Sequence, residues 1–208
     1  VYSDDPETVA EACDVLAAWD TRHLTTSVGP HIFWEFWQDV RGQDELWAVP
    51  FDAADPVYTP RQLNTANEDV AEAVRQALAS ATATLSNAGI PMDRPWGEIQ
   101  YVEKNGERIG IHGGSSSMMF SVITSRLVNG EGYADIGHGN SYIQAVTWDE
   151  SDCPDAYAIL TYSQSTDPAS DHFADATRLY SEGGWIDMPY CVEDQEAQEL
   201  RREAIEEE

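Results

Sequence analysis

Lysine is nearly absent from this chain of 208 residues, in which Lys104 is the single example. Lysine and arginine together number 11 against 38 aspartates and glutamates, so the formal net charge is -27 at pH 7. Nucleic-acid binding needs a basic patch that faces the phosphates, and the chain offers isolated arginines and the pair Arg201-Arg202. The composition therefore argues against nucleic acid as a partner.

Long apolar runs are also missing. The chain has no stretch of about 18 apolar residues, and residues 1–5 contain neither a basic residue nor an apolar stretch. We therefore expect no membrane span and no signal peptide in this segment, although a signal removed from a longer precursor would leave no trace. The acidic residues are spread along the chain rather than grouped in blocks. This pattern favours a solvated surface adapted to a salty environment over an acidic partner-binding face.

Cysteine is scarce, and the spacing of the three cysteines argues against a zinc site and against a disulfide-dense scaffold. Cys13, Cys153 and Cys191 stand far apart without a CxxC pair, so neither a zinc site nor a disulfide-dense scaffold is indicated. A single bridge between Cys153 and Cys191 and a set of inert thiols are both compatible with the sequence.

The first half of the chain carries helical patterns. Residues 6–20 repeat apolar side chains at helical spacing, and residues 32–37 are aromatic nearly all round, which predicts a helix buried on more than one side. Residues 67–87 form the clearest helix. Its apolar stripe consists of Val70, Val74, Ala77, Leu78, Ala81 and Leu85. Three prolines predict that residues 49–60 form an extended link.

Beyond residue 95 the pattern becomes that of strands. Asn105-Gly106 lies between alternating segments that include Ile99 and Ile111, which predicts a hairpin. Further strands are predicted over residues 120–125, 141–148 and 156–162. We therefore expect an α+β fold. Its parts are a helix-rich segment 1–95, an antiparallel strand segment 96–192 of the same domain, and an acidic, helix-prone tail 193–208.

By its pattern alone neither half is complete, because the predicted helices have no strand in their own half and the predicted strands have no covering helices. Either the two halves cover each other or the chain is a piece of a larger fold, and we favour the second interpretation.

Two glycine-containing segments resemble catalytic loops. His112 to Ser117 combines an imidazole, two glycines and three serines, and its backbone amides suggest an oxyanion hole, but the G-x-S-x-G spacing is lacking. Residues 137–142 follow Asp135 and contain His138, a histidine that an acidic residue could orient. Tight loops between strands explain both segments, and we favour that structural interpretation.

A third segment suggests a metal site. Asp171, His172 and Asp175 lie in a polar loop between a predicted strand and a short helix, and two carboxylates with an imidazole are ligand types for a metal. Turn formation and helix capping by Asp171 explain the same residues without a ligand, and this alternative is favoured.

Several stretches, taken together and in order, resemble the penicillin acylase family, including its acyl-homoserine-lactone and aculeacin acylase branches. The strongest similarity covers residues 139–143, 159–168, 172–175 and 179–181. Earlier stretches that are similar to the family's segments are Leu16 to Asp20, Ser27 to Gly29, Ile32 to Trp37, Pro50 to Asp52, Asp55 to Pro60, Trp96 to Ile99 and Gly113-Gly114. The sequence departs from the family pattern at Ser163, where glycine is usual, at Asp171, where proline is, and at Ala176, where glutamine is.

The resemblance implies the C-terminal part of the large subunit of an N-terminal-nucleophile hydrolase with a four-layer αββα sandwich. In that family a serine at the start of the large subunit attacks the amide and its own α-amino group acts as base, whereas residue 1 here is Val1. The oxyanion donors and the calcium ligands of the family lie upstream of the matched stretches. We therefore assign no catalytic, cofactor-binding or metal-binding residue to this chain.

The resemblance also implies partners and a location. The remainder of the same enzyme and, in the intact enzyme, a small-molecule amide are the expected partners, without an organic cofactor, and the expected location is periplasmic or extracellular. A binding or scaffold module with an exposed aromatic face at Trp34 and Trp37 is the alternative. A weaker alternative is an independent metal-dependent hydrolase that uses His112, His138 or His172.

Overall fold

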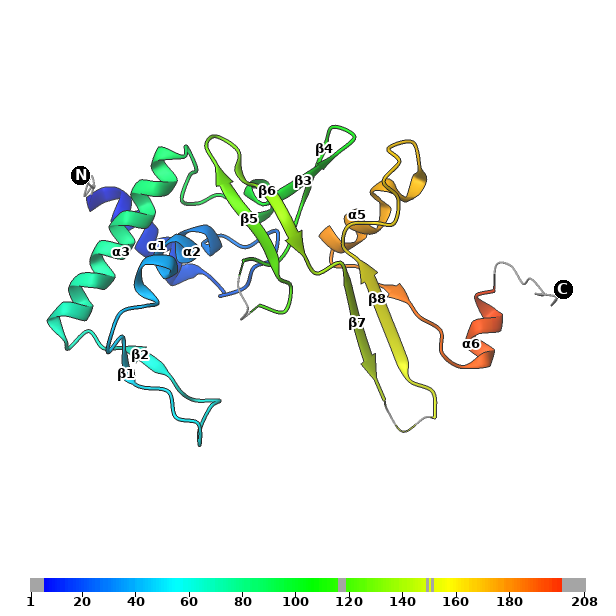
Figure 1. Ribbon diagram of the computed structural model, residues 1–208, viewed down its shortest axis with the longest axis horizontal. Helices are drawn as coiled ribbons and strands as arrows, with labels where there is room; N and C mark the ends of the chain where they lie inside the picture. The colour runs from blue at the N-terminus through cyan, green and yellow to red at the C-terminus, as the bar shows by residue number, and fades with distance from the viewer. Residues whose placement is uncertain (1–5, 116–118, 149, 151, 200–208) are drawn as a thin grey trace. The chain divides into compact units, whose positions relative to one another are not determined.

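The computed structural model describes residues 6–115, 119–148, 150 and 152–199 (Figure 1). The chain divides into two compact units, of which unit 1 comprises Val1–Val102 and Gly110–His138 and unit 2 comprises Glu103–Ile109 and Gly139–Glu208. Both combine helices with small sheets, which confirms the predicted α+β class. In the described part of the chain the strands form three two-stranded sheets and one three-stranded sheet. The single antiparallel sheet suggested by the sequence is therefore divided.

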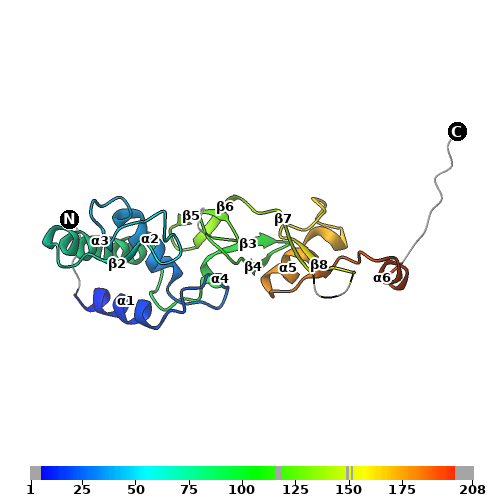
Figure 2. The same cartoon turned by 90° about the horizontal axis from the view of Figure 1, so that it is seen from below.

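Three helices form the main body of unit 1: α1 (Pro6–Ala18), α2 (Pro30–Val40) and α3 (Glu68–Asn87). Local signals fix their ends. Pro30 occupies the first turn of α2, and the side chain of Asn67 accepts a hydrogen bond from the amide of Asp69 at the start of α3. Figure 2 shows α1 alongside the α2 and α3 pair. All three helices agree with the prediction to within about three residues at each end.

The core of unit 1 consists of two apolar clusters that α2 and α3 share. Ile32 and Leu85 belong to the first cluster, and Phe36 and Val70 belong to the second. The other buried members of the first cluster are Ala12, Ala88, Ile90, Met92, Trp96, Ile99 and Tyr133. Those of the second cluster are Val40, Leu46, Ala77 and Ala81. Because α2 contributes to both, the prediction of a helix buried on more than one side is confirmed.

The segment predicted as an extended link is a hairpin with a folded loop. Strands β1 (Trp47–Val49) and β2 (Arg61–Leu63) pair antiparallel, and the loop between them projects from the helices (Figure 1). The hydroxyl of Thr59 closes this loop, because it accepts a hydrogen bond from the amide of Asp52 at 2.9 Å and donates one to the carbonyl of Asp55 at 2.6 Å. The prolines therefore mark turns rather than a continuous extended stretch.

Residues 96–110 contain the predicted hairpin and, before it, a short helix where a strand was predicted. Strands β3 (Tyr101–Lys104) and β4 (Glu107–Gly110) form the expected hairpin, with positive φ angles of 52° at Asn105 and 77° at Gly106. Ile99, however, lies in the short helix α4 (Trp96–Ile99) instead of a strand. The amides of Trp96 and Gly97 donate to the carbonyls of Ser27 and Thr25 at 2.8 Å, and these distant contacts fix the helix.

Strands β5 (Ile123–Val128) and β6 (Gly132–Gly139) form the third sheet. The strand predicted over residues 120–125 therefore begins too early, and β6 was not predicted at all. Glycine and aspartate are rare in strands, and β6 contains three glycines and Asp135. Gly132, with a φ of 98°, lies so close to Ile99 that a Cβ at this position would clash with its backbone oxygen.

Unit 2 contains the three-stranded sheet, in the order β7 (Tyr142–Thr147), β8 (Asp155–Leu160) and β9 (Ile186–Asp187). Both strand pairs are antiparallel. A 3-10 turn η1 (Asp171–Phe173) leads into α5 (Asp175–Ser181), which packs against β8, and α6 (Val192–Ala197) follows β9. Among the described residues, no helix combines the length and the apolar character needed to cross a membrane.

Candidate functional site

The polar loop of unit 2 brings together two of its three predicted metal ligands. The ring nitrogen Nδ1 of His172 donates a hydrogen bond to Oδ2 of Asp175 over 2.7 Å. This bond raises the pKa of His172 and lowers the pKa of Asp175, and it is the main cause of both shifts. The two side chains are 70% and 46% exposed, so solvent screens their attraction. The pair is a surface contact at the start of α5.

The structure does not gather the three side chains of the metal-site alternative, Asp171, His172 and Asp175. Among the described residues, the group of three potential ligands that lie close enough for one ion consists of Cys153, Cys191 and Asp194, so Asp171 does not join His172 and Asp175. Ser170, and not Asp171, caps the turn by accepting from the amide of His172 at 3.1 Å. Asp171 and Asp175 therefore belong to ordinary turn and helix-start structure.

Ser163 lies near this pair, but the three side chains are not arranged in the order that a catalytic triad requires. Its hydroxyl contacts the hydroxyl of Thr177 at 3.0 Å, and its hydrogen bond to Asp175 helps to lower the pKa of that carboxyl. Asp175 thus stands between serine and histidine, whereas a triad needs the imidazole next to the nucleophile. Ser163 has a φ of 65°, a conformation that glycine adopts more readily, which explains why glycine is usual here in the family that the sequence resembles.

Lys104 has a structural role that the sequence analysis missed. Its Nζ donates to the carbonyls of Tyr162 at 2.8 Å and Phe173 at 2.7 Å, and it lies 4.7 Å from the centre of the Phe173 ring. Partial burial lowers the pKa of Lys104. The neighbouring Asn105 donates to the carbonyl of Pro168 at 3.0 Å. The hairpin turn therefore holds the loop between β8 and α5. The sequence offered one indication that Lys104 has a particular role, namely that it is the single lysine of the chain.

The glycine loop of unit 1 does not form an oxyanion hole at its described positions. The amide of Gly113 donates to the carbonyl of His23 at 2.8 Å, and the amide of Gly114 donates to the carbonyl of Ser121 at 3.2 Å. His112 accepts a hydrogen bond at Nδ1 from the amide of Thr25 at 3.0 Å. Both glycine amides are thus engaged within the protein. Ser116 and Ser117 lie outside the described residues.

Asp135 does not orient His138, so the structure agrees with the interpretation of residues 137–142 as a loop-and-strand segment rather than with the acid–imidazole alternative. Both residues lie on β6, and side chains three positions apart on a strand point to opposite faces of a sheet. Asp135 lies 3.7 Å from Arg126, while Nε2 of His138 lies 3.3 Å from the hydroxyl of Thr124. Thr124 and His138 are a hydroxyl and an imidazole in contact, but Asp135 does not orient the ring. The acid–imidazole pair is therefore absent.

A buried network of polar groups holds the strands of unit 1 to α4. Gln100 donates through Nε2 to the carbonyls of Ile111 and Gly113, both at 2.9 Å, and accepts at Oε1 from the hydroxyl of Ser125 at 2.9 Å. The indole of Trp96 donates to the same Gly113 carbonyl at 2.8 Å. Because these buried groups satisfy one another, the network is a structural element rather than a binding site.

Four further titratable side chains of unit 1 are buried or half-buried. Tyr133 donates to Glu35 over 2.6 Å, and burial raises the pKa of both groups, although this hydrogen bond partly offsets the rise for Glu35. Burial lowers the pKa of His23 and of His31 to about 4, so both rings are neutral at pH 7. His31 donates through Nε2 to the carbonyl of Pro91 at 3.1 Å.

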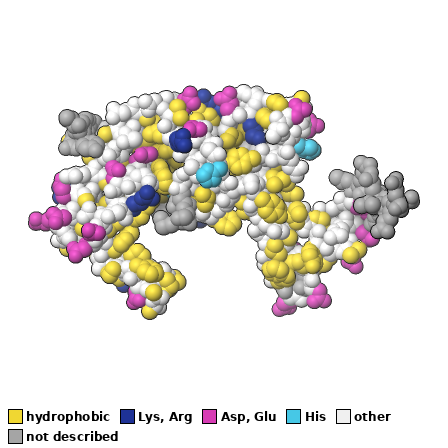
Figure 3. All heavy atoms as spheres, in the orientation of Figure 1, with side chains coloured by type: hydrophobic (Ala, Val, Ile, Leu, Met, Phe, Trp, Pro, Cys, Tyr) yellow, Lys and Arg dark blue, Asp and Glu magenta, His cyan; other side chains and the backbone are white. Residues whose placement is uncertain are grey.

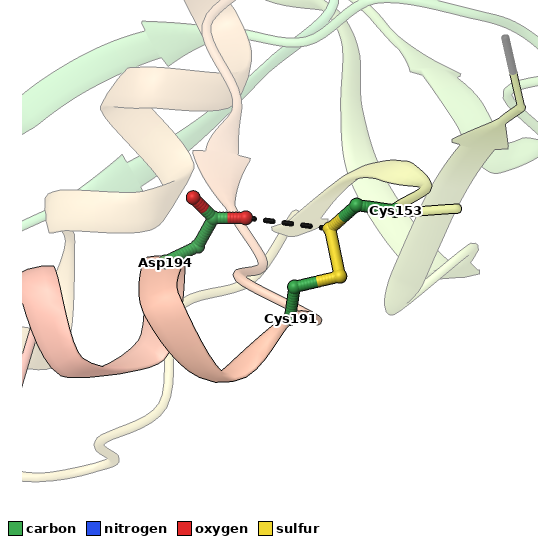
Figure 4. Close-up of side chains that lie close together, drawn as sticks. All are labelled: Cys153, Cys191 and Asp194. Atoms are coloured by element: carbon green, nitrogen blue, oxygen red, sulfur yellow. Dashed lines mark hydrogen bonds between the residues drawn. A yellow bond between two sulfur atoms is a disulfide. The ribbon is translucent and has the colours of Figure 1, made fainter. Parts of the chain in front are cut away.

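Cys153 and Cys191 form a disulfide in unit 2, which resolves the alternatives that the sequence left open (Figure 4). Oδ2 of Asp194 lies 3.4 Å from Sγ of Cys153. Cysteine ligates metals as a free thiolate, so the bridged sulfurs are not suitable ligands, and calcium prefers oxygen ligands. This group therefore does not fit the calcium that the family resemblance implies for an intact enzyme. Cys13 is a free, exposed thiol.

Two open clefts lie among the described residues. One, of about 210 Å³ in unit 2, is lined by tyrosines and by Asp155, Asp187 and Asp194, and no serine, threonine, cysteine, histidine or lysine lines it. The other, of about 290 Å³ in unit 1, lies beside Trp19 and includes Ser27, whose hydroxyl accepts from the amide of Leu24 at 3.2 Å. Neither cleft joins a nucleophile to a base.

Comparison with known proteins identifies the kind of protein that this chain resembles. The sequence profile of the penicillin amidase family matches residues 2–197. An acyl-homoserine lactone acylase PvdQ from Pseudomonas syringae pv. syringae is 34% identical over 188 residues, which cover 90% of this chain and 24% of that protein. Aculeacin-A acylase from Actinoplanes utahensis is 37% identical over 181 residues, which cover 86% of this chain and 22% of that protein. The chain thus spans about a quarter of the length of these relatives.

Proposed function

This chain belongs to the penicillin amidase family, and from that premise we propose that it is part of an amide-hydrolysing acylase whose reacting groups lie elsewhere in the protein. The observation that carries the proposal is the similarity to two acylases over most of this chain. The contacts of the candidate motifs support this proposal. The amides of Gly113 and Gly114 and the imidazoles of His112 and His172 form hydrogen bonds within the fold.

The proposed substrate is a linear amide with an acyl side chain. The relatives' names mention an acyl-homoserine lactone and the lipopeptide aculeacin A, and the family name mentions penicillin. In each class, hydrolysis of one amide bond releases a carboxylic acid and an amine. The proposed route is attack by an N-terminal nucleophile, followed by hydrolysis of the acyl-enzyme by water, without an organic cofactor.

The proposed role of this chain is to complete the four-layer αββα sandwich together with the remainder of the protein. Large apolar side chains that are exposed in this chain support this role, because the remainder of the protein would cover them. They are Phe51, Val57 and Tyr58 in unit 1, and Tyr142, Trp148 and Tyr190 in unit 2. We also propose an exported location, periplasmic or extracellular, because disulfides persist in oxidising compartments.

The aromatic residues suggested for a binding module do not form a free face. Trp34 and Trp37 are half-buried, and the ring of Trp37 stacks on Phe33 with 5.9 Å between the centres. Trp34 packs against the first cluster of unit 1. No observation at these rings favours a second function.

Three substitutions in the complete protein test whether this chain supplies reacting groups. We expect Ser115→Ala, His138→Ala and His172→Ala each to keep kcat/KM for an N-acyl-homoserine lactone within about threefold of the wild-type value, because a general base or nucleophile contributes at least about a hundredfold. Release of the free fatty acid is the measurement, and the melting temperature of each variant serves as the control for folding. A loss of a hundredfold at an unchanged melting temperature would assign chemistry to that residue and contradict the proposal.

A further inference from the structure

β7 is an edge strand with no strand on its outer side. In the described residues the sheet order is β7, β8, β9, so β8 pairs with one side of β7 and the other side is open. The paired side is well defined, because all six residues of β7 have a partner on β8, from Tyr142 opposite Leu160 to Thr147 opposite Asp155. The outer side therefore presents backbone groups to solvent.

The register tells which backbone groups point outward. The amide of Thr161 donates to the carbonyl of Ser141 at 3.3 Å, so Ser141 and every second residue after it bond to β8. The N–H and C=O groups of Tyr142, Gln144 and Val146 consequently point away from β8. The pairing of β8 with β9 is consistent with this register. Ala156, which lies opposite Val146, accepts a hydrogen bond from the amide of Met188 at 2.8 Å, so the backbone groups of Ala156 face β9 and not β7.

This edge lacks the usual protection against pairing. Natural edge strands carry charges, prolines or bulges, whereas β7 has the sequence YIQAVT, without a charged residue or a proline. The contrast is large, because 24% of the chain is charged. The second half of β7 is exposed on both faces, and Trp148, which follows it, is 70% exposed. Figure 3 shows apolar side chains gathered over β7 and β8.

We propose that the outer edge of β7 is the docking edge for an extended strand from the part of the same protein that lies outside these 208 residues. This inference rests on the proposed function and deepens it by naming the contact. Three N–H and three C=O groups, those of Tyr142, Gln144 and Val146, receive the added strand. The uncharged faces of β7 fit a strand with uncharged, partly apolar side chains at these positions.

Two observations favour the remainder of the protein over a second copy of this chain. The relatives are about four times as long as this chain, so most of such a protein lies outside it. Two copies would each carry a formal net charge of -27, and their repulsion opposes edge-to-edge pairing.

Amide hydrogen exchange, measured residue by residue, tests the docking edge. In the isolated chain we expect the amides of Ile143, Ala145 and Thr147 to be protected by β8 and those of Tyr142, Gln144 and Val146 to exchange quickly. In the complete protein the second set is expected to exchange at least about a hundredfold more slowly.

A pair of substitutions gives an independent test. Val146→Pro removes an outward N–H without removing a hydrogen bond to β8, and Val146→Thr keeps the N–H and the branched shape. We expect Val146→Pro to weaken the association of the isolated chain with the remainder of the protein at least tenfold, and Val146→Thr to change it less than threefold. The melting temperature of the isolated chain controls for local damage.

The outcomes separate this inference from the proposed function. Fast exchange at Tyr142, Gln144 and Val146 in a complete protein that hydrolyses amides overturns the docking edge and leaves the function intact. Slow exchange in a complete protein that hydrolyses no amide supports the docking edge and overturns the function. Protection that rises with the concentration of the isolated chain, together with a dimer in sedimentation, overturns the proposal by showing a second copy on β7.

Discussion

Replacement of Trp96 by alanine is expected to lower the free energy of unfolding by about 3–5 kcal/mol, which is the usual cost of removing a buried tryptophan. Trp96 is 2% exposed, and its ring lies 5.1 Å from that of Tyr133 and 5.8 Å from that of His23, measured between centres. The indole also donates to the carbonyl of Gly113. The substitution therefore leaves a cavity and removes one hydrogen bond from the buried network. Urea unfolding of the isolated chain is the measurement.

Trp148→Ala is the matched control for this experiment. Its side chain is 70% exposed, so its removal is expected to change the free energy of unfolding by less than about 0.5 kcal/mol. Equal effects of the two substitutions would contradict the assignment of Trp96 to the core of unit 1.

Removal of the disulfide is expected to lower the free energy of unfolding of unit 2 by about 4 kcal/mol. The bridge joins residues 38 positions apart, and closing a loop of that length restricts the unfolded chain by roughly this amount. The double variant Cys153→Ala/Cys191→Ala removes the bridge without leaving a free thiol at either position. Chemical denaturation, followed by a probe in unit 2, is the measurement.

Two controls accompany the double variant. Cys13→Ala removes the free, exposed thiol and is expected to leave stability unchanged. A dithiol reductant is expected to lower the stability of the wild-type chain to that of the double variant and to have no effect on the double variant. If the reductant leaves the wild-type chain unaffected, the bridge does not form in solution.

The elements that were predicted correctly are those with strong local signals. The helix α3 has a complete apolar stripe, an asparagine cap and a glycine after its end, and all of these act within about one turn of the chain. The hairpin at Asn105-Gly106 follows from two residues that tolerate a positive φ angle. Neither element depends on distant contacts for its type.

The elements that were missed depend on distant contacts. The short helix α4 is fixed by carbonyls of Thr25 and Ser27, which lie about 70 residues earlier, and no pattern within residues 96–99 reveals those partners. The strand β6 is rich in glycine, which packs poorly in strands, and Gly132 is required because Ile99 lies against it. The loop between β1 and β2 is folded by hydrogen bonds of Thr59 rather than by its prolines.

Some contacts of the candidate site residues also depend on parts of the chain that are distant in sequence. The residue types that suggested chemistry, in particular His112, Asp135 and His172, make contacts within the fold that the sequence did not reveal. The orientation of Asp135 away from His138 depends on a strand that was not predicted. The amides of Gly113 and Gly114 donate hydrogen bonds to the carbonyls of His23 and Ser121, and spacing in the sequence does not reveal these partners. The family assignment came from ordered stretches of similarity.

Hydrolysis by separated and recombined parts is the most direct test of the central claim, that this chain completes an acylase without supplying its reacting groups. The isolated chain, the remainder of the protein and their mixture are each incubated with an N-acyl-homoserine lactone, and release of the free acid is measured. We expect no hydrolysis by the isolated chain, and hydrolysis by the mixture that rises with added chain and saturates at one chain for each copy of the remainder. Hydrolysis by the isolated chain, or full hydrolysis by the remainder without it, would contradict the account.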